Sequence, residues 1–282
     1  MEVLTAKTAG FCFGVERAVR EAQEAAKEAD GIVYTFGPIV HNETVIRDLE
    51  KQGIVSIPDE EALKDVPKGS TILIRAHGIP RALENRLKDE GYRLIDATCP
   101  FVKKIHRLAE KYDREGLQVV VAGDAAHPEV IGICGYAESA AVVSSPEELC
   151  EIAKKKNGKI CLLAQTTFNH KKFKNMVENL EDLGYNATIA DTVCSATRER
   201  QEEAADLASR ADVMIVIGGK DSSNSQKLYE ICKRNCNRTY FIQTAADLMT
   251  NWWCGVNIVG ITAGASTPKT IIKEVQTNVR KF

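Results

Sequence analysis

Two stretches of the sequence are versions of one phrase: "LKDEGYRLIDATC" at residues 87–99 and "LEDLGYNATIADTVC" at residues 180–194. Each contains the end of a helical pattern, a glycine, a tyrosine, a short β-prone run, an aspartate and, three residues later, a cysteine. A helical pattern follows each cysteine, and one also follows Cys12 in "AGFCFGVERAVREAQ", residues 9–23. This repetition, with a period of roughly 90 residues, predicts tandem domains rather than a short solenoid repeat.

Two matching strand-and-loop patterns follow each cysteine. The first set is "IVYTFGPIVHNE", "QVVVAGDAAHPEV" and "VMIVIGGKDSSNS"; the second is "TILIRAHGIPRAL", "KICLLAQTTFNHKKF" and "NIVGITAGASTPKTII". In the first loops the matching positions are His41, His127 and Ser222, and in the second loops they are His77, Thr166 and Ser266. Strands that alternate with helices predict parallel sheets covered by helices, and such sheets bind ligands beyond the carboxyl ends of their strands.

The predicted fold is therefore α/β, with three similar small domains whose sheets are mostly parallel. We expect the domains at residues 13–97, 98–193 and 194–282, with the N-terminal strand within residues 1–12 completing the sheet of the third domain. If the domains pack around a pseudo-threefold axis, Cys12, Cys99 and Cys194 converge on one point with the polar loops around it. This convergence is the central hypothesis.

Composition narrows the class of protein. The chain has 282 residues, of which 44% are hydrophobic. Its formal net charge of −2 gives no positive electrostatic field that would attract nucleic acid. No run approaches the roughly 18 apolar residues of a membrane span, and the N-terminus lacks a signal-peptide pattern. We expect a cytoplasmic monomer that binds neither nucleic acid nor membrane.

Three converging thiolates at helix starts suit a metal site. In the reducing cytoplasm nine irregularly spaced cysteines do not form a disulfide framework. Three cysteine ligands leave one coordination position open for substrate, and an iron–sulfur cluster with one uncapped iron fits this better than zinc. Composition alone leaves zinc open. The other six cysteines are expected in the core or incidentally at the surface, and His106 and His170 on surface helices.

The loops carry mostly hydrogen-bond donors, which favours an anion with many acceptor oxygens, such as a phosphate or diphosphate. The donors are His41, His77, His127, Thr166, Ser222, Ser223, Asn224, Ser225 and Ser266. Glu129 is the candidate acid, since a carboxyl near a bound anion and a reduced cluster has a raised pKa. Asp96 and Asp191 are expected to tie loops or cap helices.

Together these motifs resemble the 4-hydroxy-3-methylbut-2-enyl diphosphate reductase family of the methylerythritol phosphate route to isoprenoids. The resemblance runs along the whole chain through "AGFCFGVERAV", "GPIVHN", "RAHG", "DATCP", "HPEV", "QTT", "DTVC", "SSNS" and "TAGASTP". It implies a 4Fe-4S cluster on Cys12, Cys99 and Cys194, with Glu129, Thr166 and His127 as catalytic residues. The diphosphate ligands that it implies are His41, His77, His127, Ser222, Ser223, Asn224 and Ser266.

The reaction implied by the resemblance is a reductive dehydroxylation. The allylic alcohol takes up two electrons and two protons, loses water and becomes isopentenyl and dimethylallyl diphosphate, with a ferredoxin or flavodoxin as transient electron donor. Two alternatives survive on the residues alone. One is a zinc-dependent hydrolase of a phosphorylated substrate with Glu129 as base, and the other is a non-catalytic iron–sulfur sensor of a phosphorylated ligand.

Overall fold

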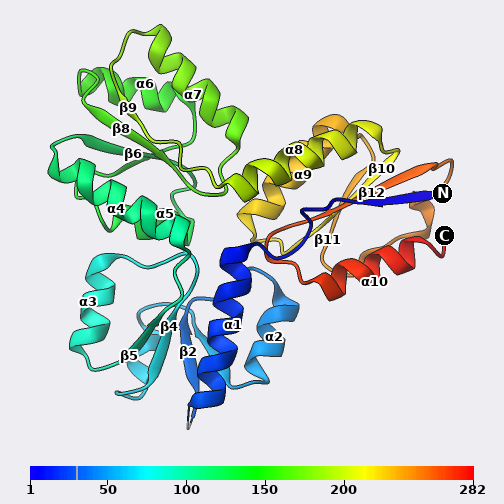
Figure 1. Ribbon diagram of the computed structural model, residues 1–282, viewed down its shortest axis with the longest axis horizontal. Coiled ribbons are helices and arrows are strands. Elements are labelled where there is room, and N and C mark those ends of the chain that lie inside the picture. The colour runs from blue at the N-terminus through cyan, green and yellow to red at the C-terminus, as the bar shows by residue number, and fades with distance from the viewer. Residues whose placement is uncertain (30) are drawn as a thin grey trace. The chain divides into compact units, whose positions relative to one another are not determined.

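Three four-stranded sheets organise the chain in the computed structural model, which describes residues 1–29 and 31–282. Every hydrogen-bonded pair of strands within them is parallel. Helices connect the strands along the chain, as Figure 1 shows. The predicted α/β class with parallel sheets is therefore confirmed.

The chain divides into two compact units. The terminal unit comprises residues 1–16, 40–51 and 195–282, and the central unit comprises residues 17–39 and 52–194. The sheets follow the intervals between the three cysteines, whereas the compact units join the first two sheets in one body. The three domain boundaries and the pseudo-threefold arrangement therefore remain predictions.

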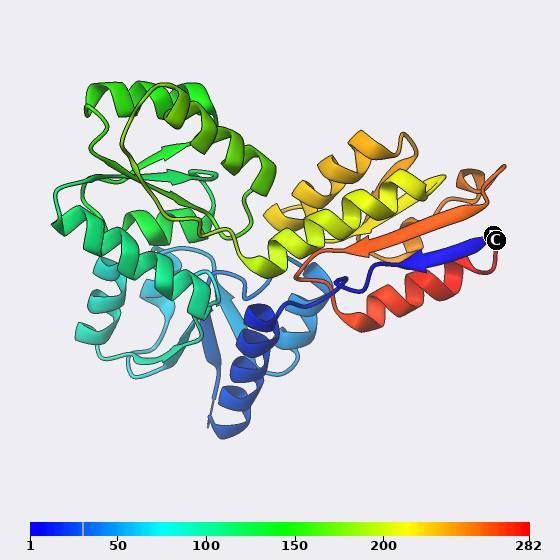
Figure 2. The same ribbon diagram turned by 45° about the horizontal axis from the view of Figure 1, so that its top comes forward.

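One sheet of the central unit has the strand order β3-β2-β4-β5. Its strands are β2 (Val33–Phe36), β3 (Ile54–Ile57), β4 (Thr71–Ile74) and β5 (Arg93–Asp96). Helix α3 (Arg81–Asp89) and the 3-10 helix η1 (Ala62–Asp65) bury leucines against one face. Helix α1 (Phe13–Glu28), the dark-blue helix of Figure 2, has residues 13–16 in the terminal unit and residues 17–28 in the central unit.

The other sheet of the central unit has the order β7-β6-β8-β9. Its strands are β6 (Gln118–Ala122), β7 (Ala141–Val143), β8 (Ile160–Ala164) and β9 (Thr188–Ile189). Helices α4 (Pro100–Arg114) and α5 (Pro128–Cys134) cover one face, and α6 (Pro146–Lys155) and α7 (His170–Asp182) cover the other (Figure 1). All five residues of β8 are buried, as expected for a strand covered on both faces.

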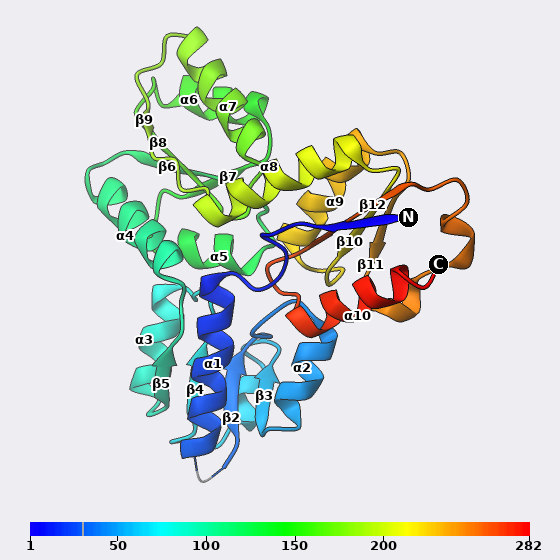
Figure 3. The same ribbon diagram turned by 45° about the vertical axis from the view of Figure 1, so that its right-hand side comes forward.

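The terminal unit contains the sheet β1-β12-β10-β11 (Figure 3). Its strands are β1 (Glu2–Thr5), β10 (Val213–Ile217), β11 (Thr239–Ile242) and β12 (Ile258–Ala263). Helices α8 (Ser195–Arg210) and α9 (Ser223–Asn235) pack on one face. Helix α10 (Lys269–Val279) packs on the other with η2 (Ala245–Asp247) and η3 (Thr250–Trp252), and α2 (Glu43–Glu50) belongs to the same unit.

The N-terminal strand lies at the edge of this last sheet. β1 pairs with β12 from Glu2 opposite Ile258 to Thr5 opposite Ile261. The first residues of the chain thus extend the sheet formed by its last part, where the sequence analysis places them.

Two sequence expectations concern exposure. Among the cysteines outside the proposed metal site, Cys161, Cys232 and Cys236 are buried and Cys254 is exposed, as expected for core and incidental positions. Over the described residues, none of the helices combines the length and the apolar character that crossing a bilayer requires.

Candidate functional site

Cys12, Cys99 and Cys194 occupy the same position relative to a helix. Helices α1, α4 and α8 each begin at the residue directly after one of these cysteines. All three cysteines are partly exposed. A thiol at a helix start lies at the positive end of the helix dipole, which favours the thiolate, the form that binds metals.

Each cysteine is also tied to a second loop by the same backbone hydrogen bond. The cysteine N–H donates to the carbonyl of the second residue after a strand, namely Ala265 after β12 for Cys12 (3.4 Å), Ala76 after β4 for Cys99 (3.0 Å) and Thr166 after β8 for Cys194 (3.1 Å). Within its own sheet, each cysteine therefore lies beside the second polar loop. The meeting of all three at one point remains a prediction.

These hydrogen bonds correct one detail of the loop positions matched between the three repeats. Thr166 is equivalent to Ala76 and Ala265, so it stands one position before His77 and Ser266 rather than level with them. The first loops keep the expected register, since His41, His127 and Ser222 are each the fifth residue after β2, β6 and β10.

The two aspartates of the repeated phrase form the same turn. Asp96 Oδ1 accepts a hydrogen bond from the N–H of Thr98 (3.0 Å), and Asp191 Oδ1 accepts one from Val193 (3.1 Å). Both aspartates thereby fix the backbone just before a cysteine, as Asx turns do. The expectation that they tie loops is confirmed.

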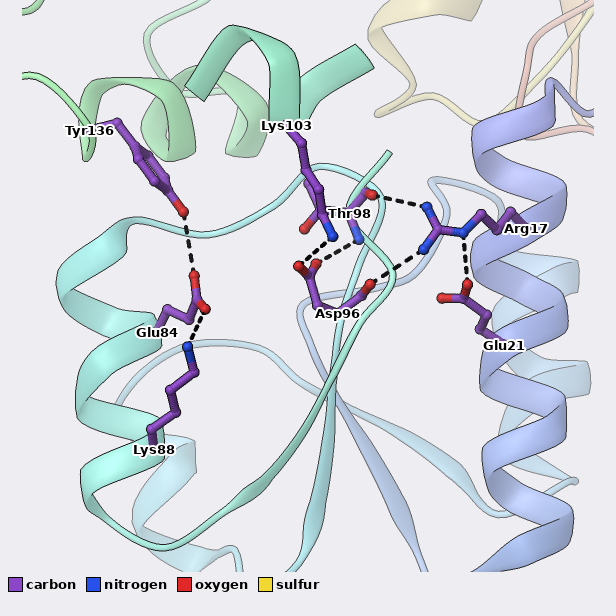
Figure 4. A network of polar contacts seen from close by, with 8 residues as sticks. All are labelled: Arg17, Glu21, Glu84, Lys88, Asp96, Thr98, Lys103 and Tyr136. Carbon is purple, nitrogen blue, oxygen red and sulfur yellow. Dashed lines mark hydrogen bonds and ion pairs between the residues drawn. The ribbon is translucent and has the colours of Figure 1, made fainter. Parts of the chain in front are cut away.

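Side chains around Asp96 brace the Cys99 loop (Figure 4). Lys103 Nζ lies 2.6 Å from Asp96 Oδ2. Burial alone would raise the pKa of Asp96, but hydrogen bonds from Lys103 and Thr98 outweigh it, and the pKa lies below its usual value. Arg17 donates to the carbonyls of Thr98 (3.3 Å) and Asp96 (3.5 Å) and pairs with Glu21 (2.7 Å). No sequence motif marks Arg17 for this role, although it stands five residues after Cys12.

Glu129 and Thr166 form a buried pair in the central unit. Glu129 is only 2% exposed on α5, and its Oε1 accepts from the Thr166 N–H (2.6 Å) while its Oε2 accepts from the Thr166 hydroxyl (2.7 Å). Burial raises the pKa of Glu129 to about 7, although both hydrogen bonds from Thr166 act to lower it. A carboxyl with this pKa is divided between acid and base at neutral pH, which suits proton transfer.

His127 caps the helix that carries Glu129. Its Nδ1 accepts a hydrogen bond from the Glu129 N–H (3.1 Å), so the neutral ring carries its proton on Nε2 and can donate it. The rings of His77 and His127 meet edge to face with centroids 5.3 Å apart. The structure therefore brings together four predicted residues within the central unit: His77, His127, Glu129 and Thr166.

Serine hydroxyls cluster in the terminal unit. Ser266 Oγ lies 3.4 Å from both Ser222 Oγ and the carbonyl oxygen of His41, and Ser225 Oγ donates to Ser222 Oγ (2.9 Å). Glycine is required at Gly219 because a Cβ there would lie 2.0 Å from the His41 carbonyl oxygen.

The remaining residues of the "SSNS" run begin α9. Ser222 is the N-cap, and Ser223 opens the helix. Asn224 is 5% exposed, and among the described residues its buried Nδ2 has no hydrogen-bond partner. An unpaired buried amide is costly, which favours a bound acceptor at this position.

The expectation of surface positions for His106 and His170 is wrong. Both are buried: His106 stacks on Tyr136 with centroids 4.2 Å apart, and His170 Nε2 lies 3.7 Å from Asp191 Oδ2. Burial lowers the pKa of His106 to about 4, so it is neutral at pH 7. His170 thus lies against the Asp191 turn, whereas His106 lines a cavity of about 200 Å³ together with Asp96, Thr98 and Lys103.

The chain is similar to known proteins along nearly its whole length. Residues 3–280 match the family model described as "LytB protein". The 4-hydroxy-3-methylbut-2-enyl diphosphate reductase of Caldanaerobacter subterraneus subsp. tengcongensis is 44% identical over 100% of this chain and 98% of its own length. The Aquifex aeolicus reductase is 42% identical over 100% and 97%.

Two solved structures are similar over nearly the whole chain. One, described as (E)-4-hydroxy-3-methyl-but-2-enyl diphosphate reductase, the terminal enzyme of the non-mevalonate pathway, has a TM-score of 0.71 at 42% identity and covers 100% of both chains. The other, the E-1-hydroxy-2-methyl-but-2-enyl-4-diphosphate reductase from Plasmodium falciparum, has a TM-score of 0.91 at 30% identity. It covers 99% of this chain and 87% of that one.

Proposed function

The chain belongs to the LytB protein family, and we propose that it reduces 4-hydroxy-3-methylbut-2-enyl diphosphate to isopentenyl and dimethylallyl diphosphate. In this reaction the allylic C–O bond breaks, two electrons and two protons are taken up, and the hydroxyl leaves as water. Because hydroxide is a poor leaving group, the protein must bring a proton to the departing oxygen. Electrons come from a ferredoxin or flavodoxin.

We assign that proton to Glu129. Its pKa of about 7 and its nearly complete burial are the observations that carry the proposal. Thr166 holds both carboxyl oxygens, so the pair can pass a proton through the Thr166 hydroxyl to a substrate oxygen beside it. The proximity of Thr166 to Cys194 sets this proton path next to a proposed metal ligand.

Cys12, Cys99 and Cys194 would hold a 4Fe-4S cluster. The donor set fits: all three cysteines are partly exposed, stand at helix starts and make the same backbone hydrogen bond to a neighbouring loop. The bound cluster would supply electrons and, at the iron without a cysteine, a Lewis-acid site for the substrate hydroxyl. The chain's part would be to orient the thiols, and the Asp96 and Asp191 turns support this for two of them by fixing the backbone just before Cys99 and Cys194.

The diphosphate would be held by neutral donors. In the central unit these are the His127 Nε2–H and His77, and in the terminal unit they are His41, Ser222, Ser223, Asn224 and Ser266. The unpaired Nδ2 of Asn224 supports this assignment, since an acceptor oxygen would satisfy it. Each hydrogen bond to a charged group contributes about 1.5–3 kcal/mol, so several together are needed to hold a multiply charged guest.

An anaerobic turnover assay tests the proposal. The purified chain is given the allylic diphosphate and dithionite-reduced methyl viologen, and products are separated by chromatography. Formation of isopentenyl and dimethylallyl diphosphates with oxidation of the viologen is expected. Release of inorganic phosphate without viologen oxidation would instead indicate a hydrolase, and binding without turnover would indicate a sensor.

A further inference from the structure

Helix α4 presents a stripe of one sign of charge to solvent. Apart from Pro100 at its first position, its exposed residues are Phe101, Lys104, Arg107, Lys111 and Arg114. Their spacing of three or four residues places them along one side of the helix. The acidic residues of α4, Glu110 and Asp113, are both partly buried.

This stripe differs from the exposed side of α6, which covers the opposite face of the same sheet. The exposed residues of α6 include Glu147, Glu151 and Lys154, so both signs of charge occur there. On α4, Lys111 and Arg114 have acidic neighbours, Glu115 and Glu110, but Lys104 and Arg107 form no ion pair with any described residue. The positive charge at the N-terminal half of the stripe is therefore available to a partner.

The stripe begins beside a proposed cluster ligand. Cys99 is the N-cap of α4, and Phe101, which is 45% exposed, follows two residues later. With a rise of about 1.5 Å per residue, Lys104 and Arg107 lie only roughly 8 and 12 Å from Cys99 along the helix axis. An exposed aromatic ring next to cations is typical of protein interfaces. A protein that docks here would place its redox centre near Cys99.

We propose that the α4 stripe, defined by Phe101, Lys104, Arg107, Lys111 and Arg114, is the docking surface for an acidic one-electron carrier protein of the ferredoxin or flavodoxin class. The inference rests on the proposed function, because the reduction needs two electrons that the substrate does not contain. Each carrier is oxidised by one electron, so two carriers dock in turn for every turnover. Opposite charge speeds such encounters, and electron-transfer complexes need only a small interface.

The test compares two electron donors on one variant pair. The variant Lys104→Glu/Arg107→Glu reverses the stripe without changing a proposed cluster, proton or diphosphate ligand. Its matched control is Lys171→Glu/Lys174→Glu, which makes the same charge change at exposed lysines of α7. Each protein is assayed with a reduced acidic ferredoxin and, separately, with reduced methyl viologen, which needs no docking site.

With ferredoxin at low ionic strength, we expect the stripe variant to lose about tenfold or more in kcat/KM for the carrier. The loss should shrink as salt is added, because screening weakens steering. With viologen, the variant and the control should match the wild type.

Three outcomes would overturn the proposal: an unchanged rate with ferredoxin, an equal loss in the α7 control, or an equal loss with viologen. Failure of the proposed function is distinct, because the wild type would then fail to turn over with viologen as well.

Discussion

The two copies of the aspartate-to-cysteine phrase have the same backbone and different surroundings. At Asp96 and Asp191 the Asx turns are alike, with hydrogen bonds of 3.0 and 3.1 Å, and both following cysteines donate to a carbonyl two residues after a strand. Around them, the Cys99 loop is braced by Lys103 and Arg17. The Cys194 loop instead binds the residue that holds the proposed proton donor.

The different surroundings of the two loops suit two different tasks, electron entry at Cys99 and proton delivery at Cys194. The repeated residues place a cysteine, the proposed cluster ligand, at a helix start, and the residues that differ decide which side chains that cysteine loop contacts. The Cys99 loop is connected to α1 and to the basic stripe of α4, which suits electron entry. The Cys194 loop is connected through Thr166 to Glu129, which suits proton delivery.

The substitution Glu129→Gln tests most strongly whether the residues beside the Cys194 loop deliver the proton. The amide keeps the size of the side chain but cannot deliver a proton, so turnover with reduced viologen should fall about a hundredfold or more. Iron content and substrate binding should be retained. The matched control is Glu151→Gln on the exposed face of α6. Turnover at the wild-type rate in Glu129→Gln would remove Glu129 from the mechanism.

The pH dependence of turnover sharpens the same point. Because the pKa of Glu129 is about 7, the wild-type rate should fall as pH rises through 7, by up to about tenfold per unit above it. Rates between pH 6 and 9, measured with viologen, check this. A flat profile would contradict the assignment.

The free energy of unfolding should also depend on the titration of Glu129, and it should decrease as pH rises. Between its ordinary value of 4.5 and about 7, Glu129 is protonated in the folded chain and ionised in the unfolded one. Its contribution to the free energy of unfolding is therefore complete below about pH 4.5 and is lost as pH rises through about 7. Urea unfolding of the wild type and Glu129→Gln at pH 5 and pH 8 measures the difference.

The two aspartates should respond differently to substitution. Asp96→Ala and Asp191→Ala each remove a turn and should lower the free energy of unfolding by about 1–2 kcal/mol. Asparagine keeps the accepting oxygen, so it should restore most of that loss at position 191. Recovery should be smaller at position 96, where the Lys103 pair at 2.6 Å is also lost, than at 191, where His170 lies at 3.7 Å. Equal recovery in urea unfolding would show that the two loops are braced alike.

The smallest expected effect is that of Arg17→Ala. Loss of its hydrogen bonds to the carbonyls before Cys99 should cost about 1 kcal/mol of unfolding free energy. Arg20→Ala, which removes an exposed side chain one turn along α1, serves as the control and should cost almost nothing. Equal losses would mean that Arg17 does not brace the Cys99 loop.

Local features of this fold were predictable because they repeat in the sequence. Helices begin directly after Cys12, Cys99 and Cys194, and His41, His127 and Ser222 share one position after their strands, since equal local patterns give equal elements. The turn-forming role of the two aspartates followed from their short polar side chains.

Features that depend on distant packing were not predictable from local patterns. His106 reads as a polar residue of an amphipathic helix, yet it is buried because it packs on Tyr136 and closely approaches Gly78. Arg17 acts on a loop about 80 residues away along the chain, which no short motif reveals. Thr166 stands one position before the equivalents of His77 and Ser266. This offset is set by the backbone hydrogen bonds of the cysteines, which the repeated sequence patterns do not reveal.

The claim that three cysteines hold one cluster is tested most directly by iron and sulfide analysis with visible and electron paramagnetic spectra of anaerobically purified variants. We predict that Cys12→Ala, Cys99→Ala and Cys194→Ala each lose the intact cluster and its spectrum, whereas Cys150→Ala, at a partly exposed cysteine of α6, keeps both. Full iron, sulfide and an unchanged spectrum in any one of the first three variants would contradict the account.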